Sequence, residues 1–134
     1  MDASAIFAMG YSETGASHEL LVLAKNNKIV LLASQYALNE VLRRVSAKYP
    51  ERLKYFERLS KDKSIQIVEI DETDLDAAEH WVADPDDAPI IAAAKRAKPD
   101  ALVSFDRKHL HTPSVEKYIG APVITAGDAL AMAR

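Results

Sequence analysis

The chain has no cysteine and only a few glycine, proline and aromatic residues. The absence of cysteine among 134 residues excludes disulfide bonds, thiolate zinc sites and a cysteine nucleophile, and it suits a reducing compartment. Four glycines and six prolines leave no room for a long flexible linker. With aromatic residues at 7% and hydrophobic residues at 49%, we expect a mainly aliphatic core and a single domain over residues 1–134.

Long hydrophobic runs are also missing. A run such as 29–34 is far too short to cross a bilayer, and no basic-then-apolar signal peptide opens the chain. We therefore expect no membrane association, and a soluble cytoplasmic protein is the simplest expectation. There is no HExxH pair, no GxGxxG or Walker loop and no GxSxG, which weighs against nucleotide binding and serine hydrolysis.

The net charge of −3 conceals an uneven distribution of charge. Residues 43–63 carry eight Lys or Arg against three acids, whereas residues 69–87 carry nine acids and no Lys or Arg. A basic stretch beside an acidic one suits a protein that meets a polyanion and also holds cations. Two ordinary solvated helix faces would give the same pattern.

Short apolar runs alternate with helical patterns along the chain, which is typical of a parallel sheet wound with helices. Strands are expected within residues 2–9, 28–33, 64–70, 101–105 and 122–125. Helices are expected over 15–27 (started by Ser17), after Ser34, after Pro50, and over 73–82, 86–98, 114–119 and 128–132. The predicted fold is therefore α/β, a single three-layer domain with a central parallel sheet of about five short strands.

Acidic residues at the junctions of strands and helices are the candidates for chemistry, because open parallel sheets place their sites there. Asp106 follows the apolar run 101–105, Asp87 opens an alanine-rich helix, and Asp2 lies in or beside the first expected strand. Simpler explanations are helix caps at Asp87 and Asp106 and a loose terminal residue at Asp2. Glu40 points away from the apolar stripe of its helix, as a solvated glutamate would.

Together these acids are more informative than any one of them. Carboxylates that converge at one edge repel each other unless cations compensate. Oxygen ligands, with no cysteine and few histidines, select Mg²⁺ or Mn²⁺ over zinc or copper. Such a metal activates water and neutralises charge on a phosphoryl oxygen, so phosphodiester hydrolysis suits this inventory best. His109 and His111 are expected in a solvated loop, with RNA or metal contact as the less favoured alternative.

Four segments, taken in order, resemble the PIN domain. They are the D-x-S of Asp2 and Ser4, Glu40 within ALNEVLRR, DPDDAPIIAAA at 84–94 and ALVSFDRKHL at 101–110. The likeness spans nearly the whole chain and is closest to the VapC-like group of bacterial and archaeal toxins of toxin–antitoxin pairs. DPDDAPIIAAA followed by a strand that ends in S-x-D is its most specific part.

The resemblance implies a metal-dependent endoribonuclease in which water is the nucleophile. The implied catalytic acids are Asp2, Glu40, Asp87 and Asp106, of which Asp2, Asp87 and Asp106 would bind Mg²⁺ or Mn²⁺. The implied partners are an RNA substrate, a cognate antitoxin that blocks the site and a second copy of the chain in a homodimer.

Two further groups of residues follow from the resemblance. Ser4 and Ser104 match small polar residues that hydrogen-bond into the site of the family. Arg43, Arg44 and Lys48 are candidates for contacts with the RNA backbone, because phosphate contacts come mainly from Lys and Arg.

One departure from the family concerns the start of the chain. PIN proteins usually have a few apolar residues before the first Asp, in a buried central strand, whereas only Met1 precedes Asp2 here. A truncated start, an unusually short strand and a less firmly held Asp2 are the alternatives.

Three other functions are compatible with sheet-edge acids. A haloacid-dehalogenase-like phosphatase would need a second Asp where this chain has Ser4, and a receiver-like phosphoacceptor would need an acidic pair and a strand-end Lys that are not evident. A catalytically weak PIN relative that only binds RNA or a partner is the third.

Overall fold

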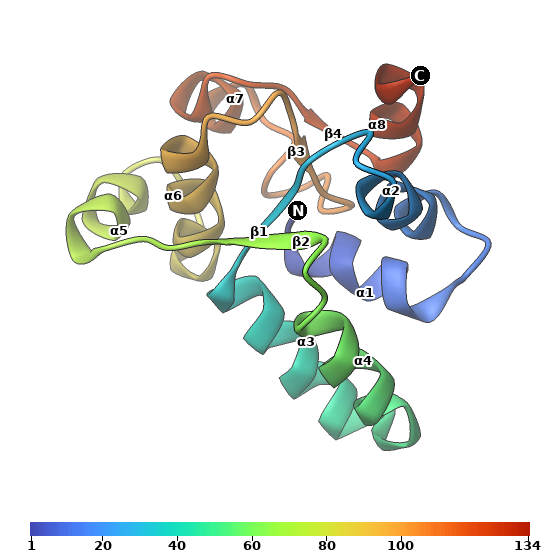
Figure 1. Cartoon of the computed structure of the whole chain (residues 1–134). Helices are drawn as coiled ribbons and strands as arrows, with labels where there is room; N and C mark the ends of the chain where they lie inside the picture. The colour runs from blue at the N-terminus through green and yellow to red at the C-terminus, as the bar shows by residue number, and fades with distance from the viewer.

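The structure, a computed structural model, describes residues 1–134 as helices alternating with four short strands (Figure 1). The elements are α1 (Ala3–Tyr11), α2 (Ala16–Lys25), β1 (Leu31–Ser34), α3 (Gln35–Lys48), η1 (Pro50–Arg52), α4 (Leu53–Ser60), β2 (Ile65–Val68), α5 (Glu72–Glu79), η2 (Pro85–Asp87), α6 (Ala88–Ala97), β3 (Leu102–Val103), α7 (Pro113–Ile119), β4 (Val123–Ile124) and α8 (Ala126–Ala133). The α/β class and the parallel strands agree with the sequence prediction.

The strands form two parallel pairs, and the predicted sheet of five strands is wrong. β1 pairs with β2 and β3 pairs with β4. Met1 and Asp2 connect the pairs, because the N-terminal ammonium donates to Leu32 O at 2.7 Å and the Asp2 N–H donates to Val103 O at 3.1 Å. Two residues thus join β1 to β3, so the carboxyl ends of both strands lie beside the start of α1.

The first strand, expected within residues 2–9, is instead the beginning of α1. Asp2 caps this helix, because its side chain accepts a hydrogen bond from the Ala5 N–H. Alanine-rich sequence favours the helix, and the buried Ile6 and Met9 fall on one face at helical spacing. A capped helix therefore prevails over the short apolar run that suggested a strand.

The other boundaries follow the prediction to different degrees. Ser34 caps α3 as predicted, because its hydroxyl accepts from the Ala37 N–H at 3.0 Å. Ser17 does not cap α2: the N-cap is Gly15, and the Ser17 hydroxyl is buried without a hydrogen-bond partner. A serine thus marked the start of a helix only at Ser34, where the hydroxyl accepts a hydrogen bond from a backbone N–H of the first turn.

An apolar cavity of about 450 Å³ lies between the two strand pairs. Of its 23 lining residues 18 are hydrophobic, among them Leu32, Ile90 and Val103, so it lacks the convergent polar groups of a hydrolytic site. Burial there lowers the pKa of the Met1 ammonium to about 6. None of the helices has the length and apolar character needed to span a membrane.

Candidate metal centre

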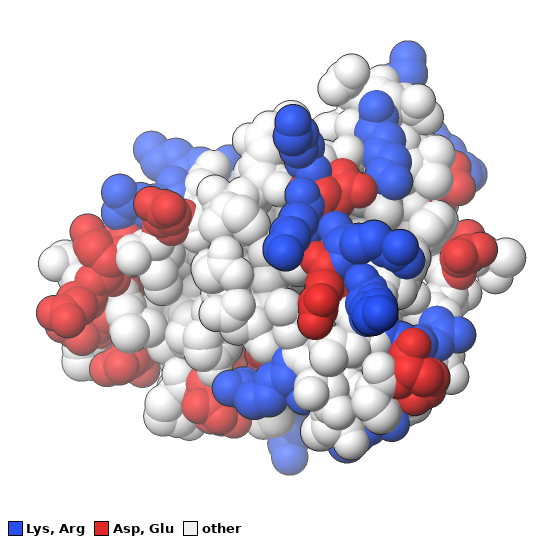
Figure 2. Space-filling view, turned by 60° about the horizontal axis from the view of Figure 1, so that its bottom comes forward, with Lys and Arg blue, Asp and Glu red and all other residues white.

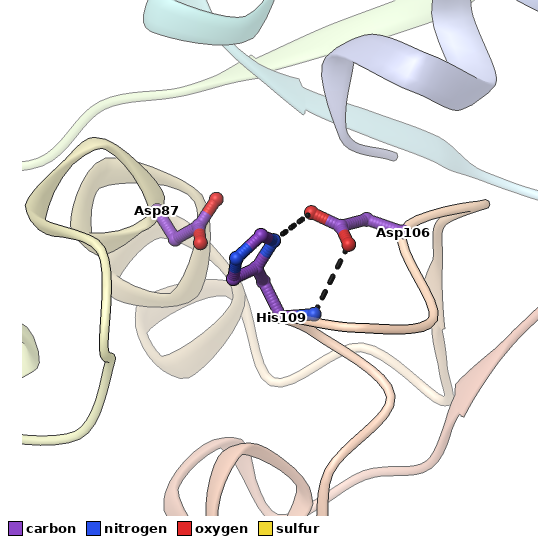
Figure 3. Close-up of side chains that lie close together, drawn as sticks. All are labelled: Asp87, Asp106 and His109. Atoms are coloured by element: carbon purple, nitrogen blue, oxygen red, sulfur yellow. Dashed lines mark hydrogen bonds and ion pairs between the residues drawn. The ribbon is translucent and has the colours of Figure 1, made fainter.

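Three segments bring carboxylates together beside the ends of the strands: the start of α1, the start of α6 and the loop after β3. Figure 3 shows Asp87 facing Asp106 and His109 across the space between α6 and that loop. Each carboxylate is placed by a different set of local interactions.

Asp2 is held by hydrogen bonds on both carboxylate oxygens. Oδ1 accepts from the Ser4 hydroxyl at 2.7 Å and from the Ala5 N–H at 3.0 Å, and Oδ2 accepts from the Ser104 hydroxyl at 2.5 Å. The residue is only 5% exposed. The alternative of a loosely held terminal residue is therefore wrong.

The two serines that hold Asp2 also hold the loop after β3. Ser104 Oγ accepts from the Asp106 N–H at 2.9 Å, and Ser4 Oγ accepts from the Phe105 N–H at 3.0 Å. Each hydroxyl donates to Asp2 and accepts from the loop at the same time. The position of Asp106 thus depends on the buried Asp2.

His109 and His111 secure the same loop, and the expectation of a plain solvated loop is wrong. Asp106 Oδ1 accepts from the His109 N–H at 3.0 Å, while Asp106 Oδ2 lies 3.2 Å from His109 Nδ1. His111 Nε2 lies 2.7 Å from Ser104 O. Both histidines are half-buried. The D-x-x-H spacing of Asp106 and His109 was the available signal in the sequence.

Asp87 differs from Asp2 and Asp106 because no hydrogen bond within the protein reaches its carboxylate. It precedes α6 but makes no side-chain cap, and η2 is capped by Asp84, which accepts from the Asp86 N–H at 3.0 Å. Burial, followed by the negative charges of Asp106 and Asp84, raises the pKa of Asp87 to about 6. The nearby charge of His109 opposes this shift. Asp87 is thus a carboxylate under electrostatic repulsion.

Asp87, Asp106 and His109 form a group that can hold a metal ion. Each offers one ligand atom, and these atoms all lie within 4.8 Å of one another. Carboxylate oxygens suit hard divalent cations, and an imidazole nitrogen is accepted by transition metals. Burial and the repulsion from Asp106 and Asp84 raise the pKa of Asp87, and a bound cation would offset that repulsion. The residues therefore fit a divalent metal.

The other predicted site residues lie outside this group. Asp2 stands behind it and is the weakest of the charges that raise the pKa of Asp87. Glu40 is half-buried on α3. The pKa of Tyr36 is raised first by burial and next by the charges of Glu40 and Asp86. The three predicted RNA-backbone residues are exposed on α3: Arg43, Arg44 and Lys48.

Comparison with known proteins found a match to a protein family. The family model of the PIN domain matches residues 1–108, which contain Asp2, Glu40, Asp87 and Asp106. No curated protein and no solved structure matches the chain. Because the family model covers most of the sequence, from α1 to the loop after β3, the chain belongs to the PIN-domain family.

Proposed function

We propose that this protein is a metal-dependent endoribonuclease that hydrolyses RNA phosphodiesters with a metal-activated water. PIN domains are generally nucleases. The observation that carries the proposal is the convergence of Asp87, Asp106 and His109 within 4.8 Å beside the ends of the strands. Family membership sets aside the phosphatase-like and receiver-like alternatives.

Asp87 and Asp106 would hold Mg²⁺ or Mn²⁺, with His109 as a third ligand. Such a metal, when bound, lowers the pKa of a coordinated water and neutralises charge on the phosphoryl oxygen. Ser104 orients the Asp106 loop through its hydrogen bonds to Asp2 and Asp106. Asp2 therefore acts mainly by positioning, with one of its four carboxylate lone pairs left for the metal.

Glu40 is proposed as the remaining catalytic acid. Its charge acts on the same side chain as that of Asp86, because after burial both raise the pKa of Tyr36. Arg43, Arg44 and Lys48 continue along the same helix and are proposed to contact RNA phosphates.

The biological role that we propose is the toxin of a toxin–antitoxin pair, acting in the cytoplasm as a homodimer. Its support is the resemblance of DPDDAPIIAAA and ALVSFDRKHL to VapC-like proteins. Expression of the chain should arrest bacterial growth, and co-expression of a cognate antitoxin should restore it. Growth arrest that persists in a cleavage-deficient Asp106→Asn variant would contradict the toxin role as a nuclease.

The nuclease function is tested by incubating the protein with labelled single-stranded RNA and Mn²⁺ or Mg²⁺. We expect cleavage that stops with EDTA and is lost in Asp87→Ala and Asp106→Ala while both variants stay folded. Single-stranded DNA of the same sequence is the control for RNA specificity. Full activity in both variants, or in EDTA, would overturn the proposal, and RNA binding without cleavage would favour the catalytically weak relative.

A further inference from the structure

Four side chains form a stack that runs from the core to the surface at the end of α1. The Phe56 ring is buried, and its centroid lies 5.8 Å from that of Phe7 at an interplanar angle of 15°. Phe7 in turn stacks on Tyr11 at 5.5 Å and 22°. The guanidinium carbon of Arg52 lies 4.9 Å above the Tyr11 ring and closes the stack. We call these four residues the aromatic column.

The aromatic column is held in place from its buried end. Gly10 lies so close to Phe56 that a Cβ on Gly10 would overlap the ring, which fixes α1 tightly against α4. At the outer end, Arg52 Nη1 donates to Tyr11 O at 3.2 Å. Tyr11 nevertheless remains 50% exposed. A flat, rigid, cationic surface is thus presented to solvent.

The surroundings of the column are basic. Arg43, Arg44, Lys48 and Arg52 are exposed, and none of them forms an ion pair with a carboxylate. Figure 2 shows Lys and Arg gathered over the α3–α4 end of the molecule, whereas acids dominate the distant α5 side. Unpaired cations around a stacked ring suit a polyanion that also carries flat groups.

The aromatic column is close enough to the metal centre for one RNA strand to reach both. α1 begins beside Asp2 and ends at Tyr11, and its nine residues correspond to about 14 Å. α3 packs against α1, begins at the same edge and carries Arg44 and Lys48 on its later turns. A single strand with one phosphate at Asp106 can therefore reach the column with a nucleotide a few positions away.

We propose that the aromatic column is a stacking platform on which a base of single-stranded RNA lies against the Arg52 guanidinium. The neighbouring Arg43, Arg44 and Lys48 bind the phosphates on either side. The inference rests on the proposed nuclease function for the identity of the ligand. An acidic protein segment would use the charges alone, whereas a base also extends the stack that Tyr11 and Arg52 begin.

Binding is tested in EDTA, so that cleavage plays no part, by fluorescence anisotropy with a labelled oligouridylate of about 12 nucleotides. The base lies against the Arg52 guanidinium, and the Tyr11 ring supports that group from behind. Loss of this stacking should weaken binding about 2- to 30-fold in Tyr11→Ala and Arg52→Lys. Tyr11→Phe keeps the ring and should bind like the parent. Arg52→Lys keeps the charge at an exposed position, so the test does not depend on how well Tyr11→Ala folds.

The matched control is Lys95, whose Nζ lies 5.1 Å from the Tyr118 ring centroid in a second cation–π pair outside the basic surface. Lys95→Ala should bind the oligouridylate like the parent. An abasic ribose-phosphate oligomer of the same length should bind the parent more weakly than oligouridylate does. It should bind Arg52→Lys and the parent with the same affinity.

Parent-like binding of oligouridylate by both Tyr11→Ala and Arg52→Lys would overturn the platform, as would equal binding of the abasic oligomer by the parent. Competition by polyglutamate with no effect of either variant would assign the surface to an acidic protein. A parent that binds RNA through the column but does not cleave it with Mn²⁺ would refute only the proposed nuclease function.

Discussion

The two halves of the site use the same carboxylate chemistry in opposite ways. In the buried half (Asp2, Ser4 and Ser104), both oxygens of Asp2 accept hydrogen bonds from groups of the protein. In the open half (Asp87, Asp106 and His109), the carboxylate of Asp87 accepts none, and burial followed by the charge of Asp106 raises its pKa. The first arrangement is held by hydrogen bonds within the protein, and a bound cation would stabilise the second.

This difference predicts which substitutions will lower stability and which will weaken metal binding. A buried carboxylate whose two oxygens both accept hydrogen bonds stabilises the fold, so its loss should lower the free energy of unfolding. Carboxylates that repel each other destabilise the metal-free protein, so their loss should leave stability unchanged or higher while it weakens metal binding. The following predictions test that division, from the largest expected effect to the smallest.

Asp106→Asn should have the largest effect of all, and the quantity affected is the cleavage activity. We expect the rate of RNA cleavage to fall about 100-fold or more, because a metal supplies several kcal/mol of charge stabilisation in the transition state. The melting temperature without metal should stay near that of the parent. Single-turnover cleavage measures the rate, and circular dichroism measures the melting temperature. A near-parental rate of cleavage would mean that the Asp106 carboxylate does not serve the reaction.

Asp2→Ala should have the largest effect on stability. The substitution removes the N-cap of α1 and leaves the Ser104 hydroxyl without its acceptor, so we expect a loss of about 2–4 kcal/mol in the free energy of unfolding. Urea denaturation measures it. The matched control is Asp86→Ala, an exposed acid beside the site whose loss should change stability by less than about 0.5 kcal/mol.

Ser104→Ala should affect both halves at once, because this hydroxyl donates to Asp2 and accepts from the Asp106 N–H. We expect stability to fall by about 1–3 kcal/mol. Metal affinity, measured by calorimetry with Mn²⁺, should fall about 10-fold through the displaced Asp106 loop. An unchanged affinity in a destabilised variant would show that the halves are independent.

The stability of the metal-free protein should depend on pH through Asp87. Its pKa in the folded state, about 6, lies above the ordinary value of 3.8. The folded state therefore holds this proton more tightly than the unfolded state, and the contribution is lost as pH rises from about 4 to 6. Metal binding competes with the proton, so Mn²⁺ should raise the melting temperature more at about pH 7.5 than at about pH 5.

Asp87→Asn provides the control for that pH dependence. The variant should flatten the stability profile between about pH 4 and 6 and should lose most of the thermal shift with Mn²⁺. A profile with the same slope as the parent would assign the titration to another group.

His109→Ala should have the smallest effect. Loss of an imidazole ligand should weaken Mn²⁺ binding about 3- to 10-fold and Mg²⁺ binding less, because nitrogen donors favour the transition metal. Calorimetry with each ion measures this preference. Equal losses for both ions would mean that His109 acts only by orienting Asp106.

The sequence by itself determined what local rules control. The Ser34 hydroxyl followed by apolar residues at helical spacing predicted α3, and Asp87 was placed correctly at the start of α6. The strand expected to run up to Asp106 ends earlier, at Val103. Caps and helical periodicity act within one or two turns, so they can be recognised in a short stretch of sequence. The order of the acids along the chain also indicated the family before any contact was known.

Only the tertiary structure decided what distant segments do to each other. Asp2 is bound by Ser104, 102 residues away, and the residues expected as a first strand belong to a helix that Asp2 caps. The role of His109 and the raised pKa of Asp87 likewise arise from burial and from charges brought close by folding. Periodicity describes one segment at a time, whereas burial and Coulomb interactions depend on distances through space.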